Sequence, residues 1–111
     1  MDVTFSKRGT TLIAKIRGEL DHHTAEYIRR KIDSEIMKSF TKNVIFDFSD
    51  ISFMDSSGIG VIMGRYKNIR QLHGRVSLVN IKPQLRRIVD MSGILKYVSI
   101  HDNVNDAINT M

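Results

Sequence analysis

The chain has 111 residues, 41% of them apolar, which is enough for one hydrophobic core, so we expect a single domain over residues 1–111. The chain lacks cysteine, which excludes disulfides, thiolate metal sites and cysteine nucleophiles. It also lacks a signal-like N-terminus and any apolar run of the roughly 20 residues that span a bilayer. We therefore expect a cytoplasmic protein without a membrane partner. The net charge of +5 arises from residues 56–89, which hold seven bases and no acid. Nucleic-acid binding would call for aromatic residues between the bases to stack on nucleotides, and Tyr66 is the only one here. The pattern therefore favours a solvated face or an acidic protein partner.

The first part of the chain predicts a hairpin followed by a helix. Apolar residues alternate with polar ones over residues 3–5 and again over 12–16, with a turn-like composition between them. Apolar residues then recur at helical spacing, which predicts an amphipathic helix over about 23–40. The inward stripe of this helix is expected to contain Ala25, Ile28, Ile32, Ile36 and Phe40.

The middle of the chain predicts a buried strand, a connection and a long helix. Residues 44–48 are almost continuously apolar and β-branched or aromatic, as in a strand buried on both faces. A connection is expected from Ser49 to the adjacent serines Ser56 and Ser57. A helix is predicted from Ser57 to about His73, and Gly74 is expected to terminate it. Its apolar stripe consists of Ile59, Ile62, Met63, Tyr66 and Ile69.

The last third predicts two further strand and helix pairs. A strand over 76–79 precedes a helix from Pro83 to Met91, which ends at Gly93. A short strand over 98–100 leads to a terminal helix capped by Asp102 or Asn103. The order ββαβαβαβα predicts an α/β fold, a mixed sheet of about five strands with about four helices packed on it.

The junction before the long helix is the strongest candidate site. It reads Asp55-Ser56-Ser57-Gly58-Ile59-Gly60, at the point where a strand pattern changes to a helical one. Backbone N–H groups and the helix dipole favour negative charge there, so the junction suits a phosphate, either bound or covalently attached. The simpler alternative is that one of the serines only caps the helix.

Three other kinds of site have weaker support. A hydrolase nucleophile needs a Gly-x-Ser-x-Gly elbow, and Met54 and Asp55 stand where its first glycine belongs. Nucleotide binding is suggested by the glycines, but Gly64 lies one residue beyond the dinucleotide spacing. His22 and His23 are adjacent, so they diverge on entering a helix, and no third ligand is spaced to complete a metal site. We therefore expect neither catalytic nor metal-binding residues.

Three stretches resemble the STAS domains of bacterial anti-sigma factor antagonists, specifically the SpoIIAA type of spore-forming bacteria. They are Gly18–Glu26, which reads Gly-Glu-Leu-Asp-His-His-Thr-Ala-Glu; Phe53–Lys67, which contains the two serines; and Asp90–Gly93. The second stretch is the most specific. The three stretches occur in the order and at the spacing of the family, so the resemblance covers most of the chain. The resemblance implies the STAS fold.

The resemblance also implies a regulatory binding protein without a cofactor. The unphosphorylated form would bind an anti-sigma factor that is also a serine kinase and so release a sporulation sigma factor, sigma-F. The kinase would phosphorylate Ser56, a metal-dependent serine phosphatase would reset the protein, and Ser57 would serve as a capping or first-turn residue. The free protein is expected to be a monomer. The expected partner-binding residues are Asp21, His22, His23, Asp55, Ser57, Gly58, Ile59 and Gly60.

Two functional alternatives within this family remain. One is a nucleotide- or small-molecule-binding STAS sensor, and the other is the antagonist of the general stress response. The bases Arg65, Lys67 and Arg70 either meet acidic groups of a partner or form a solvated face.

Overall fold

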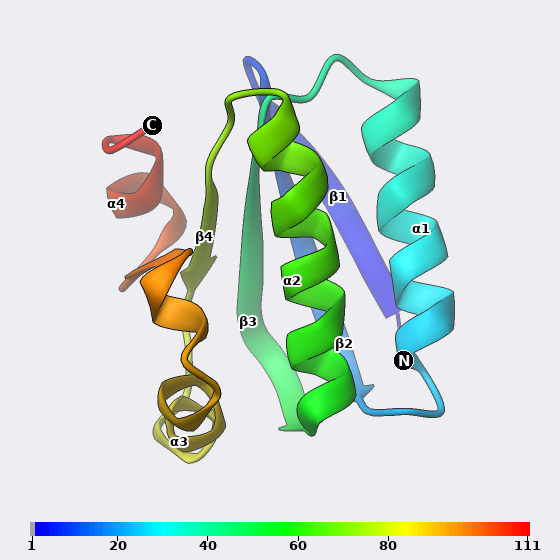
Figure 1. Cartoon of the computed structure of the whole chain (residues 1–111), viewed down its shortest axis with the longest axis vertical. Coiled ribbons are helices and arrows are strands. Elements are labelled where there is room, and N and C mark those ends of the chain that lie inside the picture. Colours follow the sequence, from blue (N-terminus) through cyan, green and yellow to red (C-terminus); the bar gives the residue numbers. More distant parts are fainter. Residues whose placement is uncertain (1) are drawn as a thin grey trace.

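The computed structural model describes residues 2–111 and has the predicted α/β order (Figure 1). One short 3-10 helix, η1, is added after the third helix. The elements are β1 (Asp2–Arg8), β2 (Thr11–Leu20), α1 (Ala25–Lys38), β3 (Asn43–Met54), α2 (Ser56–Gln71), β4 (Val76–Val79), α3 (Pro83–Ser92), η1 (Ile94–Lys96), β5 (Ser99–His101) and α4 (Val104–Ile108).

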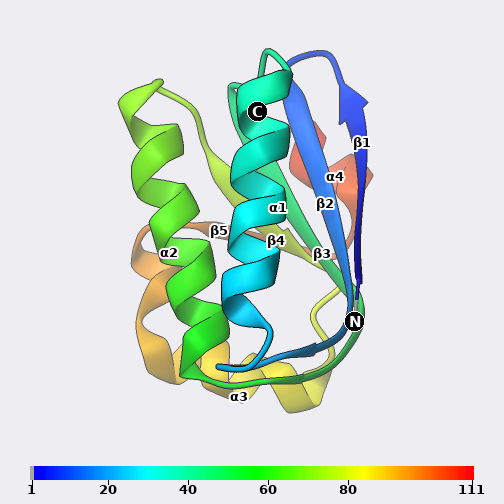
Figure 2. The ribbon, with the colours of Figure 1, turned by 90° about the vertical axis from the view of Figure 1, so that its right-hand side faces the viewer.

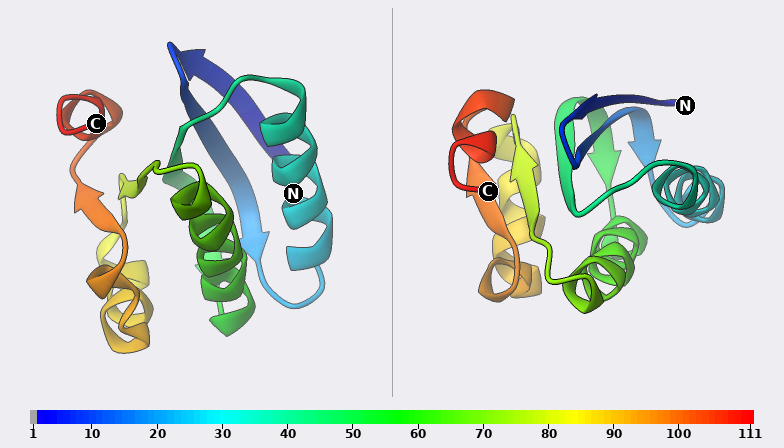
Figure 3. Two further views of the ribbon diagram at one scale, coloured as in Figure 1. Left: turned by 45° about the horizontal axis from the view of Figure 1, so that its top comes forward. Right: turned by 90° about the horizontal axis from the view of Figure 1, so that it is seen from above.

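The five strands form one mixed sheet, as predicted, and their order across the sheet is β1-β2-β3-β4-β5. β1 and β2 are antiparallel, and the other neighbouring pairs are parallel. Helices α1 and α2 lie side by side on one face of the sheet, and the short α4 lies on the other (Figures 2 and 3). The carboxyl ends of β2 and β3 therefore lead into the two helices that share a face, which brings the starts of α1 and α2 together.

The main core lies between the sheet and helices α1, α2 and α3. Phe46 and Phe48 of β3 are fully buried there, together with Ile28 and Ile32 of α1 and Ile62 of α2. A smaller cluster under α4 contains Ile13, Ile45, Val79 and Ala107. No helix within residues 2–111 is long and apolar enough to cross a membrane.

Strand β3 is much longer than predicted, because the expected connection from Ser49 onward is part of the strand. Its second half pairs in parallel with the end of β2, where Arg17 lies opposite Asp50 and Leu20 lies opposite Met54. The register shifts twice along this stretch, which breaks the alternation of apolar and polar residues that sequence patterns detect. As a result, a single residue separates the strand from α2.

Two details at helix ends also differ from the prediction. Phe40 is 84% exposed because α1 ends at Lys38, so Phe40 does not belong to the inward stripe. After α2, His73 and not Gly74 takes the left-handed conformation, with φ of 62°. Gly74 is needed for a different reason: a Cβ atom there would lie 1.7 Å from the carbonyl oxygen of Lys42.

Candidate functional site

Asp55 is the one residue between β3 and α2, and it caps the helix. Its backbone is extended, its Oδ1 atom accepts a hydrogen bond from the Ser57 N–H at 2.8 Å, and its own N–H donates to the Leu20 carbonyl at 3.3 Å. The expectation that a serine caps α2 is therefore wrong, because the carboxylate of Asp55 takes that position. Ser56 and Ser57 occupy the first turn, where Ser56 is exposed and Ser57 is half-buried.

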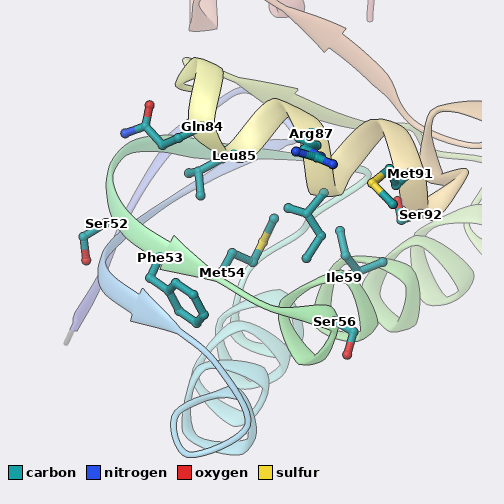
Figure 4. Close-up of a pocket in the computed structure, with 11 residues that line it drawn as sticks. Ser52, Phe53, Met54, Ser56, Ile59, Gln84, Leu85, Arg87, Met91 and Ser92 are labelled. Atoms are coloured by element: carbon teal, nitrogen blue, oxygen red, sulfur yellow. The ribbon is translucent and has the colours of Figure 1, made fainter.

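The Ser56 hydroxyl projects from the first turn of α2 (Figure 4). Within the described chain its oxygen has no hydrogen-bond partner that would hold it against the protein surface. The positive end of the α2 dipole lies beside it, although the Ser57 and Gly58 N–H groups already donate to Asp55. The hydroxyl is thus accessible to a modifying enzyme, at a position where added negative charge is compatible with the helix.

A tight turn precedes α1 and is organised by Asp21. Its Oδ1 atom accepts hydrogen bonds from the N–H groups of His23 at 2.9 Å and Thr24 at 3.2 Å. The Thr24 hydroxyl donates to the Glu19 carbonyl at 2.8 Å, which closes the turn from the other side. Partial removal from solvent raises the pKa of Asp21, but the hydrogen bonds from His23 and Thr24 outweigh this effect and lower the pKa below its ordinary value. Asp21 is therefore a structural anchor of the turn, in its charged form.

The turn before α1 meets the start of α2 through His22. The Nδ1 atom of His22 lies 3.9 Å from Oδ2 of Asp55, and the His22 and His23 rings are stacked at a tilt with centroids 3.9 Å apart. Both histidines are exposed. The structure thus brings together the two sequence stretches from which the site residues were predicted. Across residues 2–111, no group of three potential metal ligands is arranged to hold an ion.

The glycines of α2 differ in their surroundings. Gly58 is buried, and a Cβ atom there would lie 2.4 Å from Cγ of Met54 and 3.1 Å from Cδ2 of Leu20. We expected Gly58 to lie open to a partner; this is wrong, because its missing side chain makes room for the protein's own core. Gly60 is exposed with no atom within 4 Å of an added Cβ, so it remains a candidate contact residue.

An apolar groove of about 520 Å³ lies beside Ser56, between the end of β3, the start of α2 and helix α3 (Figure 4). Phe53 and Met91 in its walls are 49% and 76% exposed. Sequence analysis missed Phe53 because it was placed in a connection, and missed the α3 residues because nothing local indicates that α3 reaches this end of α2. The apolar lining residues are Phe53, Met54, Ile59, Leu85, Ile88 and Met91.

Arg65 lies on the buried face of α2 and does not belong to a solvated surface. Its side chain is 7% exposed, and its Nε atom lies 2.8 Å from Oδ1 of Asp33 on α1. Burial lowers the pKa of Arg65, and the Asp33 carboxylate opposes this effect. Arg29 also approaches Asp33, at 3.1 Å. The expectation that Arg65 meets a partner is therefore wrong: it joins α1 to α2, whereas Lys67 and Arg70 are exposed.

Comparisons with known proteins agree with this architecture. The STAS domain family matches residues 2–107. The anti-sigma F factor antagonist of Paenibacillus polymyxa is 39% identical over 100 residues, covering 90% of this chain and 86% of the relative. The anti-sigma-B factor antagonist of Bacillus subtilis is 26% identical over 90% of each chain.

Two solved structures of SpoIIAA superimpose on almost the whole chain. The unphosphorylated form has a TM-score of 0.76 and 31% identity, and covers 98% of this chain and 96% of its own. The phosphorylated form of the Bacillus protein has a TM-score of 0.74 and 32% identity, and covers 98% of each chain.

Proposed function

This chain belongs to the STAS-domain family and is an anti-sigma factor antagonist, and from that premise we propose that a phosphate on Ser56 controls its binding to an anti-sigma factor. The observation that carries the proposal is the exposed Ser56 hydroxyl, which follows a capping carboxylate and borders an apolar groove. A hydroxyl that is both accessible and beside a docking groove is well placed to switch docking on and off.

In the proposed cycle, the unphosphorylated protein binds an anti-sigma factor that is also a serine kinase, and the sigma factor is released. The kinase then transfers the γ-phosphoryl group of ATP to Oγ of Ser56: the new O–P bond forms, the bond to the ADP oxygen breaks, and the serine proton leaves. A metal-dependent serine phosphatase hydrolyses the phosphate and resets the protein. The antagonist itself provides the acceptor and a docking face and performs no catalysis.

The charge that phosphorylation adds explains the switch. A phosphoserine carries about −1.5 to −2 charges at neutral pH. On Ser56 this charge would lie beside the Asp55 carboxylate and at the edge of an apolar groove, so docking would have to desolvate two neighbouring anions. The helix dipole compensates part of the same charge in the free protein, so the fold is expected to persist. A loss of about 1.4 kcal/mol lowers affinity tenfold, which is enough for a usable switch.

The proposed docking face combines the turn before α1, the exposed start of α2 and the apolar groove. It includes Asp21, His22, His23, Asp55, Ser57, Ile59 and Gly60. The greater similarity to an anti-sigma F than to an anti-sigma-B factor antagonist supports sigma-F as the sigma factor released. We further infer a single cytoplasmic domain that is a monomer when free.

Mass spectrometry after incubation with the cognate kinase and ATP tests the acceptor. One phosphate is expected on Ser56 in the native chain, none in Ser56→Ala, and one in the matched control Ser57→Ala. Phosphate on Ser57 instead, or on neither serine, would contradict the proposal.

Binding measurements test the charge mechanism separately. Ser56→Ala is expected to bind the kinase persistently, and Ser56→Asp is expected to bind at least about tenfold more weakly. Equal affinities of the two variants would show that charge at this position is not the switch.

The volume of the groove supports one alternative, a STAS domain that senses a small molecule. Its volume of about 520 Å³ lies within the range of small-molecule sites, roughly 300–1,000 Å³. Calorimetry of the isolated chain with ATP and GTP separates the two functions, because saturable micromolar binding is expected only of the sensor.

A further inference from the structure

The seven bases of residues 56–89 do not have the same surroundings. Arg65 is paired with Asp33, and Arg86 is paired with Asp90 at 2.9 Å. By contrast, Lys67, Arg70 and Arg75 are exposed, and within residues 2–111 none of them has a carboxylate at ion-pair distance. Lys82 and the exposed Arg87 also have no carboxylate at that distance in the described chain, but they belong to the start of α3 and its interior, on the side of the Ser56 groove. The larger group of unpaired bases, Lys67, Arg70 and Arg75, lies around the second half of α2 and the start of β4.

These three bases surround a pair of tyrosines. Tyr66 of α2 and Tyr97, which follows η1, have ring centroids 5.7 Å apart at 46°. Two adjoining hollows of about 380 and 560 Å³ share Tyr66, Tyr97 and Arg70; Arg75 lines the first and Lys67 the second. We call the combined surface the tyrosine–arginine groove, defined by Tyr66, Lys67, Arg70, Arg75 and Tyr97. None of the described residues that line either hollow is an aspartate or glutamate.

We propose that the tyrosine–arginine groove is a second docking surface, which binds an acidic segment of a protein partner. Guanidinium groups bind carboxylates through paired, charge-assisted hydrogen bonds. The two tyrosine rings can pack against an apolar or aromatic side chain that lies between the acidic residues of the partner segment. Stabilisation of the helix end does not account for the whole cluster: Arg70 lies in the last turn of α2 and complements its dipole, but Arg75 lies beyond the helix.

The surroundings favour an acidic protein segment over a nucleic acid. Nucleic acids bind to extended tracks of cations, whereas this groove is bordered on its β5 side by the segment that carries the exposed Asp102 and Asp106. A long polyanion leaving the groove in that direction would meet these carboxylates. A short acidic stretch within a folded partner would not.

The groove is also remote from Ser56. Arg70 lies fourteen residues after Ser56 on the same helix, which corresponds to about 21 Å along the axis at 1.5 Å per residue. Occupation of the groove is therefore independent of the phosphate on Ser56, so the protein has a contact that survives phosphorylation. This inference goes beyond the proposed switch and does not depend on it.

Fluorescence anisotropy with a fluorescein-labelled peptide of Glu-Glu-Tyr repeats tests the proposal. The full chain is expected to bind this peptide saturably at low salt and to show no binding to the uncharged peptide of Gln-Gln-Tyr repeats. The double variant Arg70→Gln/Arg75→Gln is expected to lose at least about tenfold in affinity. The control Lys31→Gln/Lys38→Gln, which has the same net charge and changes two exposed lysines of α1, a helix that lines neither hollow, is expected to stay within about twofold.

Two further measurements cover folding and independence from the switch. Tyr97→Ala changes a 53% exposed side chain and is expected to weaken peptide binding with an unchanged circular dichroism spectrum. Ser56→Asp is expected to bind the peptide as the native chain does. Absence of saturable binding, or equal losses in the two double variants, would overturn the proposal. Tighter binding of a single-stranded oligothymidylate that Arg70→Gln/Arg75→Gln abolishes would overturn it in favour of nucleic acid. None of these results bears on phosphorylation of Ser56, which has its own test.

Discussion

Replacing Asp33 by asparagine is expected to cost more stability than replacing its partner Arg65 by methionine. Asp33→Asn leaves the Arg65 guanidinium buried without the carboxylate beside it: the asparagine oxygen and the Val61 carbonyl, at 3.4 Å, can still accept hydrogen bonds, but neither carries a compensating negative charge. The attraction of two unit charges about 4 Å apart is about 4 kcal/mol at an effective dielectric constant of 20. Because Asp33 is 28% exposed and shared with Arg29, we take about half of this, so Asp33→Asn should cost about 2 kcal/mol.

Replacing Arg65 in place of Asp33 leaves no buried charge without a partner. In Arg65→Met, the Asp33 carboxylate keeps its contact with Arg29 at 3.1 Å and its access to water, and methionine fills most of the volume of the lost side chain. The expected cost is about 1 kcal/mol or less. In the double variant Asp33→Asn/Arg65→Met, the asparagine substitution should add little to the loss of stability, because the buried cation that it would leave unpaired is no longer present.

Urea denaturation at neutral pH measures these differences as shifts of the unfolding midpoint at constant slope. Arg86→Met, which removes an exposed pair with Asp90, is the control and should cost less than about 1 kcal/mol. Equal costs for Asp33→Asn and Arg65→Met, or additive costs in the double variant, would refute the reasoning that burial of Arg65 makes Asp33 indispensable.

Three further predictions concern the site itself. Asp55→Ala removes the cap of α2 and should lower the free energy of unfolding by about 1 kcal/mol in urea titrations; no loss would show that the cap is dispensable. Gly58→Ala should destabilise by about 1–3 kcal/mol, because its Cβ would overlap Met54, whereas Gly60→Ala has free space and should stabilise the helix by about 0.5–1 kcal/mol; thermal unfolding of the pair compares them, and the opposite order would contradict the packing. The lowered pKa of Asp21 means that its contribution to stability is present above its ordinary pKa of 3.8 and is lost as the pH falls through the folded-state value. The stability difference between the native chain and Asp21→Asn should therefore shrink in acid, and a difference that stays constant from pH 6 to pH 3 would count against this role.

The regular parts of the fold were predictable because their signals are local. The apolar spacing of Ile28 and Ile32, the proline that opens α3 and the left-handed Gly93 that ends it each act within a few residues, and all are found where expected. The same holds for Asn103, whose side chain accepts from the Asp106 N–H and caps α4.

The features that sequence analysis missed depend on contacts between distant segments. Arg65 resembles a surface base until Asp33 of another helix is placed against it. The end of β3 contains Ser49 and Asp50, which interrupt the apolar pattern, and only the pairing with β2 reveals a strand there. The groove beside Ser56 likewise needs α3 to be packed against the start of α2. Ser56 could thus be proposed as the acceptor from the sequence, but the surface that surrounds it could not be predicted.

The one-residue junction between β3 and α2 constrains how the proposed kinase could reach Ser56. Many kinase substrates are flexible segments that take an extended shape in the active site, but Ser56 is fixed between a core strand and a sixteen-residue helix. If Ser56 is the acceptor, as proposed, the kinase has to recognise it on a folded surface, and an unfolded copy of the chain does not present that surface. Folding stability then sets the amount of signalling-competent protein, so a substitution far from Ser56 that unfolds part of the population weakens the signal in the same proportion.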